Sequence, residues 1–145
     1  MAKKSTKRPA AKRGAPVSRA RKPAAPAKVP KIGAKYQGGI YAGLTLHDNK
    51  PMALILLPGE RENITWDDAV KWAAKYKGKL PSRVDQLVLR ENVKAQFKDA
   101  TYWSGAQYAG NDAYAWAQHF NYGTQNTYHK DDEFRARAVR RLPIE

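Results

Sequence analysis

The sequence predicts an α+β domain that follows a disordered basic tail. Residues 1–35 hold 12 basic residues and no acidic one, whereas residues 36–145 hold 15 basic and 13 acidic residues and all 15 aromatics. The apolar pattern after residue 36 indicates two strands, then two helices, then several short strands, an order typical of the α+β class. We therefore expect a tail over residues 1–35 and one domain over residues 36–145.

The tail has five prolines and no aromatic residue, and its only larger aliphatic side chains are Val17, Val29 and Ile32. So little apolar surface cannot offset the entropy of the chain, which predicts disorder. Basic side chains that neutralise phosphates release counterions and give salt-sensitive binding without sequence preference, which favours a nucleic-acid partner. A solubilising linker and an anchor in a larger assembly are the alternatives. The cations expected to contact nucleic acid are Lys3, Lys4, Lys7, Arg8, Lys12, Arg13, Arg19, Arg21, Lys22 and Lys28.

The domain opens with two apolar runs, residues 40–46 and 52–57, separated by the polar residues 47–51. We expect a hairpin here. A helix should follow from Thr65, whose side chain is a suitable cap, to Gly78, which favours a helix end. Its predicted inward face is Trp66, Ala69, Val70, Ala73 and Tyr76.

A second helix is predicted after Ser82, because Ser82 followed by Asp85 resembles a capping box. Its apolar spacing predicts that Val84, Leu87 and Val88 face inward. From Thr101 the period of the pattern changes to two, which indicates strands. One side of these strands would carry Tyr114, Trp116, Gln118, Phe120 and Tyr122, and a closing strand is predicted over residues 134–142.

The composition excludes several classes of protein. Without cysteine the chain has no disulfides, thiolate metal sites or cysteine nucleophiles. The longest apolar run, residues 52–57, is far shorter than the roughly 20 residues of a membrane helix, and the first residues lack the apolar stretch expected of a secretory signal. We expect a soluble protein with no membrane partner, synthesised in the cytoplasm.

Several motifs in this order resemble the C-type-lectin-like fold: ITWDDAVKWAAKYKGKLPSR at 64–83, YWSG at 102–105, AYAWAQHFNYGTQN at 113–126 and RARAVR at 135–140. The chain is most similar to the family named after the C-terminal domain of the Legionella collagen-like adhesin, which is common in bacterial and prophage genes. The resemblance implies two helices packed on short antiparallel strands. It also implies a ligand-binding scaffold that recognises proteins or glycans through the late loops, here about residues 102–129.

The chain departs from two branches of that fold. It lacks the cysteine of the formylglycine-generating enzymes, and it lacks the sequence triplets of the calcium-dependent sugar site. Calcium takes about six to eight oxygen ligands, and only Asp112 supplies a carboxylate in the late loops. We therefore expect no metal and no cofactor.

Tyrosine, tryptophan and side-chain amides are concentrated between residues 102 and 129, a composition typical of contact surfaces. Trp103, Trp116 and Phe120 are expected in the core. The expected ligand-binding surface is Tyr108, Asn111, Asp112, Tyr114, Tyr122, Gln125, Asn126, Tyr128 and His129.

Nothing in the sequence indicates catalysis. The three histidines, His47, His119 and His129, have no metal-binding or catalytic spacing, and Ser104 lacks the frame of a nucleophile elbow. Arg137 and Arg140 are expected to make structural hydrogen bonds.

Two functions remain open. The first is a non-enzymatic binding protein, encoded by a phage or prophage and carried in the virion, whose tail docks on nucleic acid or in the particle. The second is a bacterial nucleic-acid-associated protein whose tail carries the function.

Overall fold

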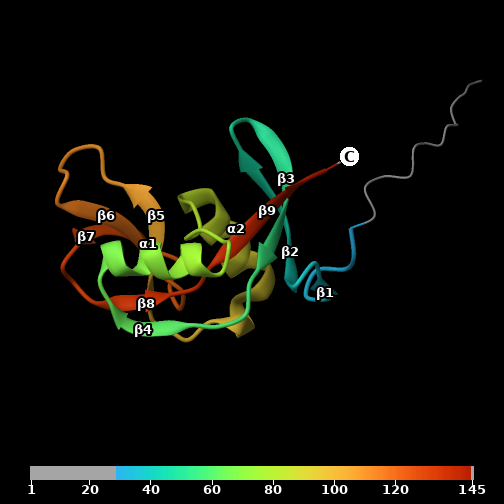
Figure 1. Cartoon of the computed structure of the whole chain (residues 1–145), viewed down its shortest axis with the longest axis horizontal. Coiled ribbons are helices and arrows are strands. Elements are labelled where there is room, and N and C mark those ends of the chain that lie inside the picture. The colour runs from blue at the N-terminus through green and yellow to red at the C-terminus, as the bar shows by residue number, and fades with distance from the viewer. Residues whose placement is uncertain (1–28, 145) are drawn as a thin grey trace, which may run out of the picture. The chain divides into compact units, whose positions relative to one another are not determined.

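The computed structural model describes residues 29–144. This part of the chain is mixed α+β, which confirms the predicted class, and it contains two α-helices and mostly antiparallel strands (Figure 1). One sheet has the strand order β1-β2-β3-β9 and the other β4-β8-β5-β6-β7, with only β5 and β8 parallel. The elements are β1 (Lys35–Tyr36), β2 (Gly39–His47), β3 (Lys50–Leu56), β4 (Arg61–Ile64), α1 (Trp66–Lys75), α2 (Arg83–Val93), the 3₁₀ turn η1 (Lys94–Gln96), β5 (Thr101–Gln107), β6 (Tyr114–His119), β7 (Gln125–His129), β8 (Phe134–Ala136) and β9 (Val139–Pro143).

The ten tail cations expected to contact nucleic acid lie outside the described residues. The compact unit runs from Pro30 to Ile144, so it starts before the predicted boundary at residue 36. Backbone pairing explains the difference, because Tyr41 bonds Gly33 and Ala34 (2.8 and 2.9 Å) and Lys35 pairs with Ile40.

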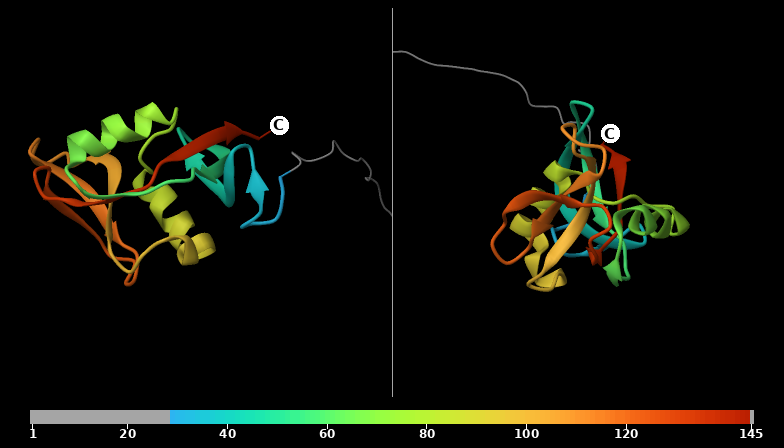
Figure 2. Two further views of the ribbon diagram at one scale, coloured as in Figure 1. Left: turned by 60° about the horizontal axis from the view of Figure 1, so that its bottom comes forward. Right: turned by 90° about the vertical axis from the view of Figure 1, so that its left-hand side faces the viewer.

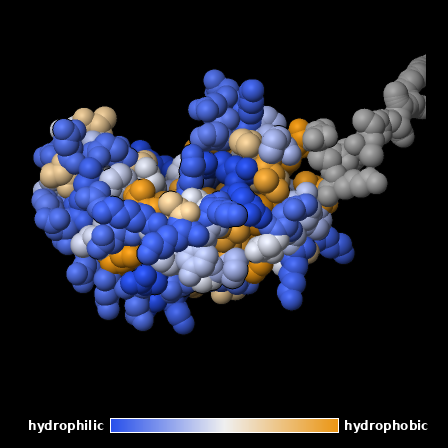
Figure 3. Space-filling model, in the orientation of Figure 1, coloured by the Kyte–Doolittle hydropathy of each residue, from blue (hydrophilic) through white to orange (hydrophobic). Residues whose placement is uncertain are grey.

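The predicted opening hairpin is present as β2 and β3, but its turn is shorter than expected. Only Asp48 and Asn49 separate the strands, and both have positive φ (52° and 64°). Asp and Asn tolerate this conformation, which matches the twist of a two-residue hairpin. The tip of the hairpin is hydrophilic, whereas apolar side chains gather in the middle of the same face (Figure 3).

Strand β2 contains a bulge between Tyr41 and Gly43, where the strand passes close to α2. Gly43 has φ of 112°, and a Cβ atom there would lie 2.5 Å from Nδ2 of Asn92. That same amide donates to the carbonyl of Ala42 (2.7 Å). The bulge therefore requires glycine, and it lets α2 hydrogen-bond directly to the backbone of β2.

Helix α1 begins after Thr65 as predicted, although the Thr65 side chain makes no capping hydrogen bond. Its inward face differs from the prediction. Trp72 is buried with Ala69 and Ala73, whereas Val70 and Tyr76 are 40% and 52% exposed. The buried stripe of α1 is therefore Ala69, Trp72 and Ala73, and the large ring of Trp72 lies in the core.

Helix α2 has the predicted capping box: Ser82 Oγ accepts from the backbone N–H of Asp85 (3.0 Å), and Asp85 Oδ2 accepts from the backbone N–H of Ser82 (2.9 Å). The predicted inward face is wrong, because Val84 and Leu87 are 44% and 52% exposed and Val88 is half-buried. The buried residues are Asp85, Gln86, Leu89 and Val93.

The predicted closing strand is two strands in different sheets. Strand β8 pairs with β4 and β5, and β9 pairs with β3. Arg137 and Ala138 lie between them, both buried. As predicted, the arginines bond to backbone: Arg137 donates to the carbonyls of Gln96 (2.7 Å) and Leu57 (3.0 Å), and Arg140 donates to that of Gln37.

Two apolar clusters fill the space on either side of the strands. The first surrounds Trp72 and Trp103, and the second surrounds Leu89, Tyr102 and Phe120. Helix α2 lies between the two sheets (Figure 2) and contacts β2, β5 and β6. Among residues 29–144, no helix has the length and apolar content needed to cross a bilayer.

Asp85 connects α2 to the four-stranded sheet. Its side chain is fully buried, and its oxygens accept from Thr45 Oγ1 on β2 (2.5 Å) and from both Nε and Nη2 of Arg141 on β9 (2.9 and 2.7 Å). Together with the bond from the N–H of Ser82, the Asp85 carboxylate accepts hydrogen bonds from β2, from β9 and from the cap of α2. A buried ion pair that loses one partner leaves an uncompensated charge in the interior.

We therefore expect Asp85→Asn to lower the free energy of unfolding by about 3 kcal/mol or more. Asp68→Asn, at an exposed carboxylate in the first turn of α1, is the matched control and should change it by less than about 1 kcal/mol. Guanidinium denaturation followed by circular dichroism measures both. Equal effects of the two substitutions would contradict the role given to Asp85.

Candidate functional site

Strand alternation gives the five-stranded sheet one aromatic side. Tyr114, Trp116 and Gln118 point to one face of β6, and Ala115 and Ala117 point to the other, where they are buried in the first cluster. Register across β7 adds Gln125, Thr127 and His129 to the aromatic side. The sequence pattern predicts this alternation correctly for β6. Beyond β6 the chain turns: Phe120 is buried in the second cluster against Tyr102, the register partner of Gln118, and Tyr122 is exposed.

Helix α2 covers only one end of this side. Gln118 is fully buried beneath the helix and donates to the carbonyl of Gln86 (2.8 Å). The helix begins at Arg83, whose guanidinium carbon lies 3.5 Å from the centre of the Trp116 ring. Trp116 is therefore half-buried, and its predicted place in the core is wrong, whereas Trp103 and Phe120 are fully buried as predicted.

Gln125 holds Arg83 in this position. Arg83 Nε donates to Gln125 Oε1 (3.0 Å), and Gln125 Nε2 donates to the carbonyl of Arg83 (2.9 Å) and to Gln118 Oε1 (2.9 Å). The guanidinium is thus fixed over an indole ring, an arrangement in which the cation is attracted to the face of the ring. The sequence gives no signal for Arg83, because its partner is 42 residues away.

Two further aromatic pairs extend the surface. The ring of Tyr108 meets Trp116 edge to face with centroids 5.8 Å apart, and Tyr114 meets His129 at 5.5 Å. Gly110 permits the Tyr108 position, because a Cβ atom there would lie 2.7 Å from the tyrosine ring. We call this surface the aromatic face; it consists of Arg83, Tyr108, Tyr114, Trp116, Gln125 and His129.

His129 presents a defined edge to this surface. The backbone N–H of Asp131 donates to His129 Nδ1 (3.1 Å), and the Asp131 carboxylate lies 3.6 Å from the same nitrogen, so Nδ1 is engaged within the loop. His129 is exposed, and Tyr114 beside it is half-buried. The aromatic face therefore combines two phenols, an indole, an imidazole and one cation, groups suited to stack on a flat ring and to hydrogen-bond its edge.

The structure does not bring the other predicted ligand-binding residues to this face. Tyr128 lies on the opposite side of β7, where it is half-buried and packs on Phe134 (4.8 Å). Asn126 is exposed on that side, opposite Ala117. Asn111 and Asp112 are exposed in the loop between β5 and β6, and Tyr122 is 70% exposed in the turn after β6, stacked on His119.

Ser104 is fully buried within β5. Its Oγ donates to the carbonyl of Trp116 (2.7 Å) and accepts from the N–H of Ala106 (3.1 Å), so the hydroxyl is used in the sheet. Over the residues that the structure describes, no group of three or more His, Asp and Glu side chains is placed to hold a metal ion.

A network around Glu60 was not predicted from the sequence. Arg135 Nη1 lies 2.6 Å from Glu60 Oε2, and the Tyr102 hydroxyl donates to Glu60 Oε1 (2.8 Å) and accepts from the N–H of Lys98 (2.9 Å). Burial raises the pKa of Tyr102 well above its ordinary value, and the hydrogen bond to Glu60 raises it further. The phenol stays protonated and serves as a donor, which indicates a structural network.

Comparison with protein families and with curated proteins finds no match to this chain.

Substitution of the fully buried Trp103 should lower the free energy of unfolding more than substitution of the half-buried Trp116. Trp103→Phe removes the bond from the indole Nε1 to the carbonyl of Ile64 (2.9 Å) and leaves a cavity, so we expect a loss of about 2 kcal/mol or more. Trp116→Phe should cost less than about 1 kcal/mol, because its ring lies at the surface. Guanidinium denaturation tests this, and a larger loss for Trp116→Phe would place that ring in the core after all.

Proposed function

We propose that this protein is a non-enzymatic ligand-binding protein whose aromatic face recognises a protein or a glycan. The observation that carries the proposal is the Trp116 ring, held at the surface beneath Arg83 (3.5 Å) and beside Tyr108. Aromatic rings at a surface, even half-buried ones, favour binding to sugar rings and to protein side chains, since they offer contact area at low entropic cost. Because Arg83 is held by Gln125, its part of the surface is preorganised before a ligand arrives.

The proposal includes a C-type-lectin-like fold of the kind found in the adhesin family. Two helices packed on short, mostly antiparallel strands agree with this assignment. So does the contact between two of the resembling motifs, in which the N–H of Gly105 in YWSG donates to the carbonyl of Pro81 in the GKLPS turn (2.8 Å). A Cβ atom on Gly105 would lie 3.1 Å from the carbonyl oxygen of Leu80, which accounts for the glycine in that motif.

We further propose that the chain is encoded by a phage or prophage and functions in the virion, with its tail docked on nucleic acid or in the particle. The separation of charge supports this: 12 basic residues and no acidic one lie in residues 1–35, and residues 36–145 are nearly neutral. The second candidate, a bacterial nucleic-acid-associated protein, rests on the same tail. In the first candidate the protein functions by binding a ligand at the aromatic face, whereas in the second the tail alone carries the function.

Ligand binding should depend on the aromatic face and not on exposed tyrosine in general. The full-length protein is screened against a glycan array, phage particles and host surface extracts. For the ligand found, Trp116→Ala and Tyr114→Ala should each weaken binding about tenfold or more. Tyr76→Ala removes an exposed tyrosine from the end of α1 and should leave the affinity unchanged. If no ligand is found in any of the three screens, the proposal fails.

The tail should bind DNA in a strongly salt-dependent way. If it neutralises six phosphates, the affinity for duplex DNA should fall about a thousandfold between about 50 and 200 mM salt. A full-length variant in which the ten tail cations are replaced by glutamine should lose this dependence. Fluorescence anisotropy measures both, and an affinity that is flat across this range would exclude a phosphate role for the tail.

A further inference from the structure

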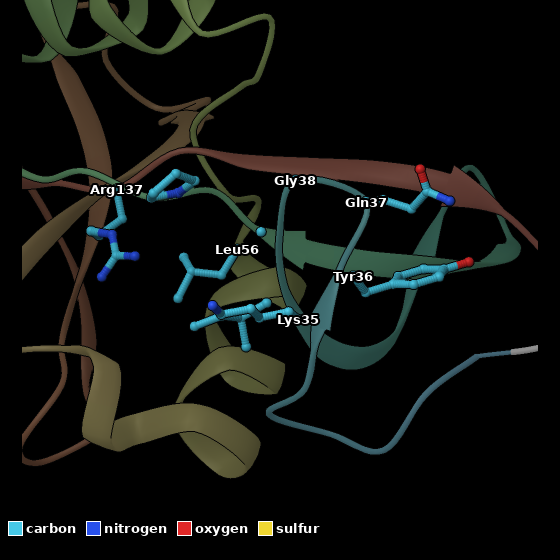
Figure 4. A pocket seen from close by; sticks show the side chains of 9 residues that line it. Lys35, Tyr36, Gln37, Gly38, Leu56 and Arg137 are labelled. Carbon is cyan, nitrogen blue, oxygen red and sulfur yellow. The ribbon is translucent and has the colours of Figure 1, made fainter.

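A pocket of about 570 Å³ opens beside β1, among residues that the aromatic face does not use. It lies between the turn that joins β1 to β2 and the segment that follows β3 (Figure 4). Its volume falls within the range of small-molecule sites, about 300 to 1,000 Å³. The side chains that line it are Lys35, Tyr36, Gln37, Ile40, Leu56, Pro58 and Arg137, together with Gly38 and Gly39.

The wall of the pocket is mainly apolar. Ile40, Leu56 and Pro58 supply aliphatic surface, whereas the ring of Tyr36 points away from the hollow and packs on Tyr41 (5.9 Å) (Figure 4). Gly39 brings the β2 backbone against β3, since a Cβ atom there would lie 2.3 Å from the carbonyl oxygen of Leu56. An apolar wall with a few convergent polar groups is the usual composition of a small-ligand site.

Arg137 places a buried charge at this pocket. The residue is only 8% exposed, and among residues 29–144 no carboxylate lies within 4.0 Å of its guanidinium. Two of its five N–H groups donate to the carbonyls of Gln96 and Leu57, but its Nε is buried with no hydrogen-bond partner in this part of the chain. Burial lowers the pKa of Arg137, which indicates that the charged form is poorly solvated there.

Lys35 adds a second positive charge. It is exposed on β1, and Figure 4 shows its side chain running below Leu56 with its end toward Arg137. Two cations therefore line the same apolar hollow. An oxyanion between them would supply the counter-charge that Arg137 lacks, since hydrogen bonds between guanidinium and carboxylate are among the strongest in proteins.

We propose that this pocket binds a small organic carboxylate, with its carboxylate group held by Arg137 and Lys35 and its apolar body against Ile40, Leu56 and Pro58. The site is separate from the aromatic face and does not rest on the proposed function. A second hollow of about 510 Å³ beside α1 provides a contrast. The arginine that lines it, Arg141, is already neutralised by Asp85 at 2.7 Å.

The test uses the full-length variant whose ten tail cations are glutamine, so that the tail cannot collect anions. Isothermal titration calorimetry compares three probes with the same apolar chain: decanoate, decanol and decylamine. Decanoate should bind at one site per chain. Decanol and decylamine should bind about tenfold more weakly or worse, because decanol carries no negative charge to pair with the two cations and decylamine carries a positive one.

Matched substitutions locate the site. Lys35→Met should weaken decanoate binding several-fold, whereas Lys31→Met, at an exposed lysine four residues earlier and outside the pocket, should not change it. Ile40→Trp should block binding by filling the pocket. Arg137→Met would also remove two hydrogen bonds to backbone carbonyls and could destabilise the fold, so it is not used as a test. The role of Arg137 is instead measured in the protein that retains this arginine. In an NMR titration, the Nε–H signal of Arg137 should shift with decanoate, saturate at one equivalent, and remain in place with decanol.

Three outcomes would each overturn the proposal. Equal affinity for decanoate and decanol would leave an apolar pocket with no role for the cations. Equal effects of Lys35→Met and Lys31→Met would assign the binding to general surface charge. Absence of decanoate binding at millimolar concentration, with no shift of the Arg137 signal, would show that the buried guanidinium needs no anion.

Discussion

The contacts of the buried Asp85 carboxylate determine how the helices meet the sheets. It is bonded to Thr45 on β2, to Arg141 on β9 and to the cap of its own helix. These bonds fix both the position and the rotation of α2. The next residue, Gln86, then donates to the carbonyl of Tyr102 on β5 (3.1 Å). Two adjacent polar residues, Asp85 and Gln86, thus join α2 to both sheets from the buried face of the helix, where apolar residues would be expected.

The aromatic face follows from that placement. Because α2 begins at Arg83, it covers Gln118 but leaves the rest of that side of β6 without a covering helix. At the end of the helix, the guanidinium of Arg83 stacks on Trp116 and is held there by its hydrogen bond to Gln125. Trp116 is thereby held rigidly without being buried, a combination that suits a contact surface, since a ligand would not have to order the ring on binding.

Two arginines in the segment from β8 to β9, Arg137 and Arg141, differ in whether a carboxylate neutralises their charge. Arg141 is neutralised by a fully buried carboxylate, so it contributes to the fold. Arg137 is buried, and in the described part of the chain its guanidinium donates to two backbone carbonyls and lies 5.4 Å from the centre of the Phe97 ring, contacts that solvate a charge without neutralising it. The first arrangement is complete by itself. Arg137, by contrast, has no paired carboxylate among residues 29–144 and lines an apolar pocket, which is why we propose that a ligand carboxylate binds there.

The sequence by itself determined the class of the fold, the β2–β3 hairpin followed by two helices, the alternation along β6 and the Ser82–Asp85 cap, because these depend on patterns and hydrogen bonds within a few residues. Only the tertiary structure decided which sides are buried. Asp85 and Gln86 turn inward because their partners come from residues 16 to 56 positions away, and Trp116 stays outside because of where α2 starts. Hydrophobicity along a sequence cannot reveal such partners, since a polar residue is buried only when distant groups satisfy it.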